Sequence, residues 1–341
     1  MPAAEAPDAP PEVNPPDAPP EVETGPRARR GAFELEGRAA PGLYLVGWGL
    51  VIAGLGAIFI AVASGAGSGS SVAFVLGIGA LGLGLTAGSG AQALQRRADG
   101  AVYPGPSPLL VFGAVLAITL VVGFALGALG GLPEGPISSL AAVLIQAAIL
   151  VGLIALVVVS PGALTWREMG FRRPGPGEGS AIADVAWGVA LAIPTLFGSA
   201  LLAALLVGLL GVAPVSPLPA ARDPAEVLVN LLVAAVIAPL SEETFFRGFT
   251  TTAWARSAGA RAAIVRGAVF FAFVHVVTMV GSDFRTAFLT AFIAFAVRLP
   301  VGLVLGWVFL RRRTIIAPIA LHSAYNAIPV LLALGAVTAR S

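Results

Sequence analysis

The chain has 341 residues, of which 57% are hydrophobic and only 11% are charged, and its mean hydropathy is +0.92. Soluble proteins carry about 25% charged residues, so this composition excludes a soluble globular enzyme and indicates a polytopic membrane protein. The absence of cysteine excludes disulfides, thiol nucleophiles and thiolate metal sites. The net charge of +2 favours no particular partner, and we expect none among nucleic acids.

Residues 1–40 are predicted to be a disordered cytoplasmic tail rich in Pro, Glu and Ala. The hexapeptide Asp-Ala-Pro-Pro-Glu-Val occurs twice within it, at Asp8–Val13 and Asp17–Val22. Such a segment cannot bury enough apolar surface to fold. We therefore expect a solvated tail rather than a docking motif.

Apolar runs of about 20 residues follow, the length that a helix needs to cross ~30 Å of hydrocarbon. They predict an all-α bundle of about nine transmembrane helices. Four accessory helices are expected in residues 41–162, and about five helices of a catalytic core in residues 163–338. The runs cover residues 42–63, 72–94, 108–130, 138–160, 183–212, 225–246, 263–281, 285–310 and 314–337.

The second run is rich in glycine, which we interpret as close helix packing rather than a nucleotide-binding loop. Two prolines bear on the later runs. Pro239 is expected to break the sixth run, and Pro300 is expected to kink the eighth.

Arginine placement predicts the orientation, because cytoplasmic loops carry an excess of basic residues. Most arginines fall in the N-terminal tail or at every second loop after it, including Arg247, Arg266 and the run Arg311–Arg313. The opposite side holds Arg222, Arg285 and Arg340. This split places the N-terminus in the cytoplasm of a multi-pass cell-membrane protein and the C-terminus outside.

Three polar sites interrupt the last four runs: Glu242-Glu243 with Arg247, His275 preceded by Phe271, and His322 followed by Asn326. A spacing of four residues puts each such pair on one helical face. His275 lies nine residues past Arg266, and His322 lies nine past Arg313. At 1.5 Å per residue both histidines are about 13 Å inside the boundary that these arginines mark. We therefore expect the three sites to converge in one cavity open toward the cytoplasm.

These residue types suit amide hydrolysis. A carboxylate in a low-dielectric pocket can act as general base for water. A nearby histidine can share that water or protonate the leaving amine, while a second histidine and an asparagine amide can donate to a developing oxyanion. Glu243 and Arg247, four residues apart, are expected to form a supporting ion pair. Arg298, within the eighth run, is interpreted as a snorkelling or ion-pair residue, with substrate contact as the less favoured alternative.

Several alternatives stay open. Glu242, His275 and His322 are also a donor set for a two-histidine, one-carboxylate zinc site, although no cofactor is our first expectation and the His-Glu-x-x-His motif is absent. Serine hydrolase chemistry is disfavoured because no Gly-x-Ser-x-Gly elbow occurs. Two other functions stay open. The protein could be a non-catalytic partner in bacteriocin immunity or scaffolding, or an ion-coupled transporter that uses the two glutamates.

The three motifs resemble those of the CPBP family of intramembrane endopeptidases, which includes CAAX proteases, bacteriocin-processing and immunity proteins and abortive-infection-like proteins. The family pattern, Glu-Glu-x-x-x-Arg, Phe-x-x-x-His and His-x-x-x-Asn, reads here as Glu242 to Arg247, Phe271 to His275 and His322 to Asn326. The stretch Leu164–Arg173 resembles the amphipathic segment that precedes the family's core. The resemblance covers about residues 164–337.

The resemblance implies an intramembrane endopeptidase acting on a peptide or lipidated-protein substrate in membrane lipid. It assigns Glu242 as the base that activates water and His275 as its partner. It assigns His322 and Asn326 to the oxyanion hole, and Glu243 and Arg247 to support of the site. Family members with CAAX activity cut behind a prenylated cysteine and release a C-terminal tripeptide.

Overall fold

All secondary structure that the structure describes is helical, as predicted. The computed structural model describes residues 35, 37–64, 67–131, 135–172, 180–213, 223–277, 279 and 282–338. The tail predicted to be disordered lies almost wholly outside these residues, as do Arg173, Arg222 and Arg340.

Each of the nine predicted runs contains a helix. Proline occupies the first turn of several helices, where its missing N–H has no intrahelical partner in any case. Elsewhere a side-chain oxygen caps the helix: Ser180, Asp223 and Asp283 each accept from a backbone N–H three residues on. The α-helices are α1 (Pro41–Ala63), α2 (Ser68–Ala98), α3 (Pro108–Ala128), α4 (Pro136–Ile154), α5 (Ala181–Leu210), α6 (Pro224–Leu232), α7 (Ala238–Glu243), α8 (Thr252–Ala258), α9 (Ala260–Val274), α10 (Phe284–Arg312) and α11 (Ile316–Thr338), with π-helical segments η1 (Ala155–Val159), η2 (Val233–Ile237) and η3 (Thr244–Thr251).

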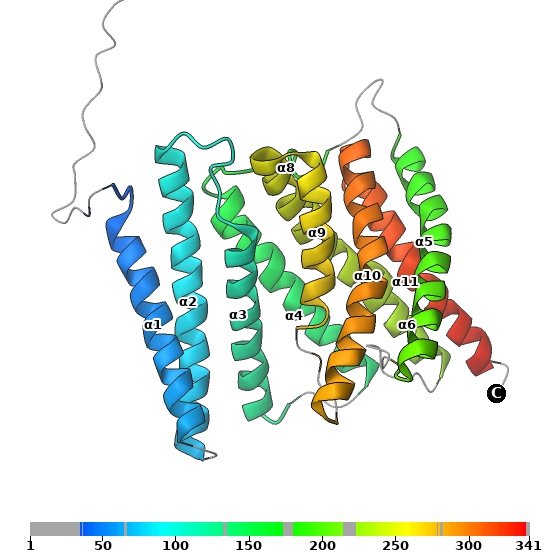
Figure 1. Ribbon diagram of the computed structural model, residues 1–341, viewed down its shortest axis with the longest axis horizontal. Helices are drawn as coiled ribbons and strands as arrows, with labels where there is room; N and C mark the ends of the chain where they lie inside the picture. Colours follow the sequence, from blue (N-terminus) through cyan, green and yellow to red (C-terminus); the bar gives the residue numbers. More distant parts are fainter. Residues whose placement is uncertain are drawn as a thin grey trace, which may run out of the picture.

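Seven of the described helices are long and apolar enough to cross a membrane, which makes this a multi-pass membrane protein. The other two predicted runs correspond to shorter helices. The first is α9, with 15 residues, and the second is α11, whose apolar part covers Ile316–Leu332. Helix α1 begins at one face of the molecule and α11 ends at the opposite face (Figure 1), as an odd number of crossings requires.

The predicted break at Pro239 is wrong. Residues 224–258 form one 35-residue helix, from α6 through η2, α7 and η3 to α8. The π-helical segments η2 and η3 flank α7, and Pro239 lies in the first turn of α7. Because proline removes one N–H from the helical ladder, the local widening to π geometry accommodates it without ending the helix.

This long helix also corrects the position of Arg247, which the sequence placed in a cytoplasmic loop. Arg247 lies inside η3 with 2% of its surface exposed. In the sequence the sixth apolar run ends before Arg247, because the buried ion pair of Glu243 and Arg247 interrupts it, but the helix itself continues.

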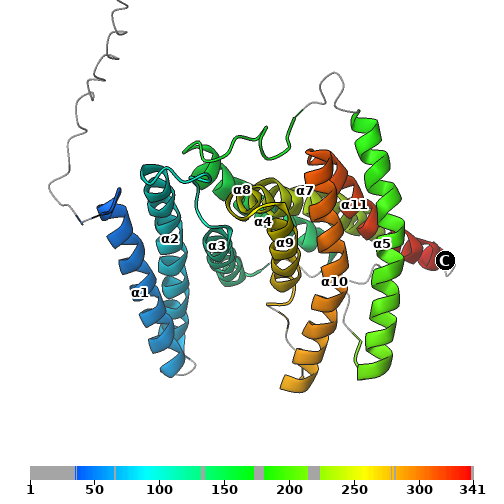
Figure 2. The same cartoon turned by 45° about the horizontal axis from the view of Figure 1, so that its top comes forward.

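The helices stand side by side, with α1 and α2 at one edge of the molecule and α5 at the other (Figures 1 and 2). The main buried cluster lies between these edges. It joins aromatic side chains of η3 and α9 to aliphatic side chains of α3 and α4. Phe245, for example, contacts Phe112 of α3 at 6.1 Å and Phe270 of α9 at 6.4 Å between ring centroids.

Glycines allow α1 and α2 to pack closely, as the glycine-rich second run predicted. A β-carbon at Gly54 of α1 would lie 2.6 Å from the Gly77 carbonyl of α2, and one at Gly84 would lie 2.8 Å from the Gly47 carbonyl. Only residues without a side chain permit this approach of two backbones.

The segment from Leu164 forms turns between α4 and α5 and ties neighbouring elements together. The Gly170 carbonyl accepts from the Ile315 N–H at 3.1 Å, and Arg172 Nε donates to the Arg313 carbonyl at 2.7 Å. Glu168 forms an ion pair with Arg256 of α8 at 2.7 Å. The segment therefore fixes the ends of α8, α10 and α11 at one face.

Candidate active site

Glu242 and Glu243 lie at the end of α7, and their carboxylates have different environments. Glu243 is fully buried, with 0% of its surface exposed, whereas the Glu242 side chain is 24% exposed. Adjacent residues on a helix point about 100° apart, so one carboxylate enters the helix bundle and the other lines a more open space. The structure thus separates the two glutamates into an inner and an outer position.

The inner glutamate is the centre of a polar network. Glu243 Oε1 lies 2.9 Å from Arg247 Nη1 and 2.8 Å from His322 Nδ1 of α11. Arg247 also reaches toward the Gly302 carbonyl of α10, at 3.5 Å. The predicted ion pair between Glu243 and Arg247 is therefore present, and it links three segments of the chain.

The outer glutamate faces both histidines. Glu242 Oε2 lies 3.6 Å from His275 Nε2 and 4.0 Å from His322 Nε2. These separations exceed those of direct hydrogen bonds, and no described donor lies within hydrogen-bond distance of Glu242 Oε2. The predicted convergence of the three polar sites is confirmed, with one carboxylate oxygen opposite two imidazole nitrogens.

Both imidazole rings are oriented through Nδ1. His275 Nδ1 lies 2.6 Å from the Phe271 carbonyl of its own helix, and His322 Nδ1 bonds the Glu243 carboxylate. Because both partners only accept hydrogen bonds, each Nδ1 carries a proton. In a neutral ring Nε2 then holds a lone pair, and it is this atom that points toward Glu242.

His275 also marks an unexpected helix end. The seventh run was expected to continue to residue 281, but α9 ends at Val274 and His275 begins a turn. The imidazole donates to the Phe271 carbonyl, one of the acceptors left without a partner in the last helical turn. The histidine therefore helps to cap the helix that positions it.

Phe271 is the aromatic wall of this site. It is 2% exposed, and its ring centroid lies 4.5 Å from that of His275 and 5.8 Å from that of His322. The Arg247 guanidinium carbon lies 4.6 Å from the same centroid, within cation–π distance. Phe271 thus packs against residues from all three polar motifs.

Asn326 lies one turn beyond His322 on α11. Its amide nitrogen donates to the Ala234 carbonyl of η2 at 2.8 Å. This bond supplies a partner for a carbonyl in the π-helical segment before Pro239. One amide N–H of Asn326 is thereby used to hold the long helix, and its second N–H is the donor available for another acceptor.

Gly302 and Gly306 of α10 lie near the site but were not identified from the sequence. A β-carbon at Gly302 would lie 3.0 Å from Ala268 Cα, and one at Gly306 would lie 3.5 Å from Ile264 Cα. These two contacts show which residues of α9 and α10 lie opposite one another in the antiparallel pair. Arg298 precedes Gly302 by one turn on the same face, so it lies near the level of Ala272. The Gly302-x-x-x-Gly306 spacing was the signal for this close approach.

The guanidinium of Arg298 is half-buried and donates to the Ala294 carbonyl of its own helix at 2.9 Å. It lies within electrostatic reach of Tyr325 and Glu242. No described carboxylate forms a salt bridge with it. The expectation of an ion-pair partner among the described residues is therefore not met.

Metal binding was the chemical alternative for this donor set. In the described part of the chain, no group of three or more His, Asp or Glu side chains is arranged to hold a metal ion. The two Nε2 atoms and the Glu242 oxygen are nevertheless the donor types that zinc accepts. The zinc alternative thus stays a prediction that needs a chemical test.

Comparison with known proteins agrees with the placement of this site. A family model, the Rce1-like type II CAAX prenyl endopeptidases, matches residues 224–328. No curated protein and no solved structure matches the chain. The match begins at the first residue of α6 and extends beyond Asn326, so it contains all three polar motifs. Residues 224–328 are therefore similar to the Rce1-like type II CAAX prenyl endopeptidases.

Proposed function

We propose that this protein is an intramembrane endopeptidase in which Glu242 activates water to hydrolyse a peptide bond. The observation that supports this proposal is the placement of Glu242 Oε2 opposite the Nε2 atoms of His275 and His322. The Glu242 side chain is 24% exposed, while the buried Glu243 is occupied by Arg247 and His322. Only the outer glutamate is thus placed to exchange a proton with a reactant.

In the proposed reaction a water molecule donates one hydrogen bond to Glu242 and one to the lone pair of His275 Nε2. The water oxygen attacks the peptide carbonyl carbon as its proton passes to Glu242. That proton is then transferred to the amide nitrogen, the C–N bond breaks, and the amine leaves. One carboxylate therefore serves as base and then as acid.

The negative oxygen of the tetrahedral intermediate needs hydrogen-bond donors, and we assign this role to His322 and Asn326. Nε2 of His322 donates only when the ring is doubly protonated, and the Glu243 carboxylate at Nδ1 stabilises that cation. The second amide N–H of Asn326 is the other donor. Removing one such donor lowers kcat about 10²- to 10³-fold in well-studied hydrolases.

Arg298 favours CAAX-type processing near a free C-terminus. Such substrates have a carboxylate three residues beyond the scissile bond, and a guanidinium with no carboxylate partner among the described residues is a natural partner for a substrate anion. We expect Arg298→Gln to raise the KM for peptides with a free C-terminus and to leave the KM for amidated peptides unchanged. An equal increase for both peptides would contradict this role.

The direct test is cleavage of a mixed library of farnesylated and unmodified peptides by the purified protein in lipid. Cleavage of the farnesylated peptides alone would support prenylated substrates, and cleavage of both would support a broader endopeptidase. Absence of cleavage throughout would favour the alternative of a non-catalytic protein in bacteriocin immunity or scaffolding. No observation on this structure supports a transporter.

We further propose that residues 41–162 form an accessory unit and residues 163–338 the catalytic core, in a cell membrane with the N-terminus in the cytoplasm. The site would then open toward the cytoplasm. Reporter fusions after Ser341 test the orientation, since the proposal places this end outside the cell.

A further inference from the structure

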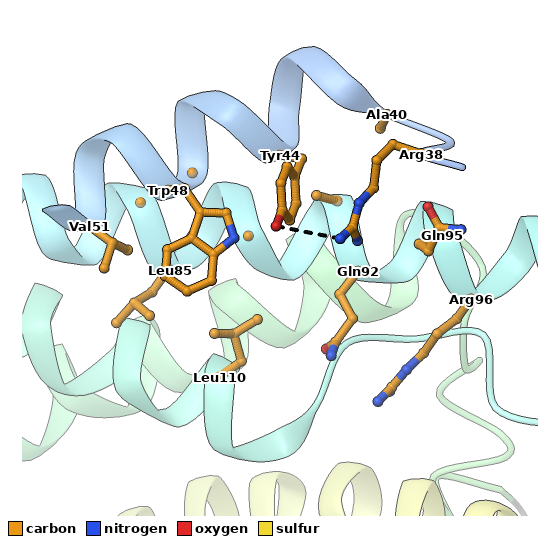
Figure 3. A pocket seen from close by; sticks show the side chains of 14 residues that line it. Arg38, Ala40, Tyr44, Trp48, Val51, Leu85, Gln92, Gln95, Arg96 and Leu110 are labelled. Carbon is orange, nitrogen blue, oxygen red and sulfur yellow. Dashed lines mark hydrogen bonds between the residues drawn. The ribbon is translucent and has the colours of Figure 1, made fainter. Parts of the chain in front are cut away.

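A cavity far from the catalytic groups lies between α1, α2 and α3 (Figure 3). Its volume is about 500 Å³. One end is lined by Arg38, Gln92, Gln95 and Arg96, and Figure 3 shows these side chains apart from the apolar group around Trp48 and Leu85. We call it the interfacial cavity.

The polar end lies where helices meet the membrane surface. Arg38 precedes the first residue of α1, Pro41, and Arg96 lies in the last turn of α2. The apolar lining continues along α1 to Val51, ten residues from Pro41. At 1.5 Å per residue the lining extends about 15 Å, half of the ~30 Å hydrocarbon thickness. The cavity therefore has the length of one leaflet.

Charge at the polar end is not neutralised by the described residues. Arg38 Nη2 lies 3.5 Å from the Tyr44 hydroxyl, and its guanidinium carbon lies 4.1 Å from that ring centroid. Arg96 Nη1 donates to the Gly105 carbonyl at 2.7 Å. No described carboxylate pairs with either guanidinium. Each guanidinium has five N–H donors, most of which remain for a ligand.

Glycine keeps the apolar end open. Gly88 of α2 lines the cavity, and a β-carbon built there meets only a methyl carbon of Leu110, at 3.9 Å. Trp48 lies on the opposite side and is 53% exposed, so the cavity is continuous with the surface that faces lipid. An occupant can enter sideways from the bilayer.

We propose that the interfacial cavity binds an anionic phospholipid of the adjacent leaflet, with its anionic head group between Arg38 and Arg96 and an acyl chain along Trp48 and Leu85. Guanidinium groups recognise phosphate oxygens through paired hydrogen bonds. The apolar lining excludes a small hydrophilic anion as the best occupant. This site is independent of the proposed peptidase activity.

The test uses the full chain reconstituted in phosphatidylcholine bilayers with and without phosphatidylglycerol, followed by native mass spectrometry of the lipids that remain bound. We expect the wild type to retain phosphatidylglycerol in preference to phosphatidylcholine. The double variant Arg38→Gln/Arg96→Gln should bind phosphatidylglycerol at least tenfold more weakly. A matched control, Arg261→Gln/Arg311→Gln, removes two exposed arginines elsewhere and should change binding less than twofold.

Two further arms separate head-group from chain recognition. Glycerol phosphate in excess should not displace the lipid, because it lacks the chain. Gly88→Leu should weaken lipid binding by filling the apolar end while both arginines remain. Equal retention of the two lipids by the wild type, unchanged binding in Arg38→Gln/Arg96→Gln, or displacement by glycerol phosphate would each overturn the proposal.

Discussion

The two adjacent glutamates should respond very differently to the same substitution. Glu243→Gln removes the charge that pairs with Arg247 Nη1 at 2.9 Å and with His322 Nδ1 at 2.8 Å, at a site with 0% exposure. Breaking a buried ion pair from one side destabilises a protein by about 3–5 kcal/mol, because the remaining charge is left without a partner. The Glu242 side chain is 24% exposed, and its Oε2 accepts no hydrogen bond from the described residues, so Glu242→Gln breaks no direct bond at this atom and should cost less than about 1 kcal/mol.

The assay is equilibrium unfolding of both variants in mixed micelles, followed by tryptophan fluorescence. A loss of 3 kcal/mol lowers the ratio of folded to unfolded protein more than 100-fold, well within the resolution of such titrations. The second variant Glu243→Gln/Arg247→Met removes both charges. Its loss should be smaller than the sum of the two single losses, since no uncompensated guanidinium remains.

Equal destabilisation in Glu242→Gln and Glu243→Gln would contradict the inner and outer positions of the two glutamates. Additive losses in the double variant would also contradict them, because additivity would mean that Glu243 and Arg247 do not interact.

Other predictions concern the residues that support the site. Asn326→Leu should leave the Ala234 carbonyl without its partner and destabilise the protein by about 1–3 kcal/mol, measured in the same titration, and stability equal to the wild type would contradict this. Gly302→Leu should prevent the close contact of α9 and α10 and reduce the yield of folded protein on size-exclusion chromatography, whereas a wild-type yield would refute that register. The Arg256 guanidinium holds the pKa of Glu168 below the ordinary value of 4.5, so this pair adds stability above that pH and loses it as the pH falls through the lowered pKa. The pair is partly exposed, so Arg256→Gln should reduce thermal stability only slightly at pH 7 and not at all near pH 2; an equal reduction at both would argue against it.

Much of the fold could be predicted because hydrophobic run length directly reports membrane helices. The chemistry-bearing residues were also visible, since Glu242, His275 and His322 are expensive in an apolar segment and stand out from it. Their convergence is confirmed by the distances around Glu242 Oε2.

The depths of the two histidines were predicted from arginines that do not both mark a membrane boundary. Arg266 was taken as a boundary residue, but the register of α9 and α10 places it near the level of Val304. This level is two turns from Arg312, the last residue of α10. Positions along two helices cannot be compared from sequence until their relative register is known.

Other features depended on long-range contacts that a linear pattern does not contain. The continuity of the helix through Pro239 depends on π-helical segments and on Asn326, which lies 92 residues from the carbonyl it binds. The inner position of Glu243 depends on a histidine 79 residues away. Local propensity indicates a break at proline, and only the packed bundle shows which carboxylate is enclosed.

The measurement that tests the central claim most directly is peptide cleavage in lipid by the wild type and by Glu242→Gln, each with and without a strong chelator. Glu226→Gln, in the first turn of α6, is the matched control on the same long helix. The account predicts that Glu242→Gln folds and binds peptide but does not cleave it, that Glu226→Gln cleaves normally, and that the chelator changes nothing. Cleavage by Glu242→Gln at the wild-type rate would contradict the role of this carboxylate, and loss of wild-type cleavage in chelator with recovery in zinc would replace the glutamate mechanism with a metal one.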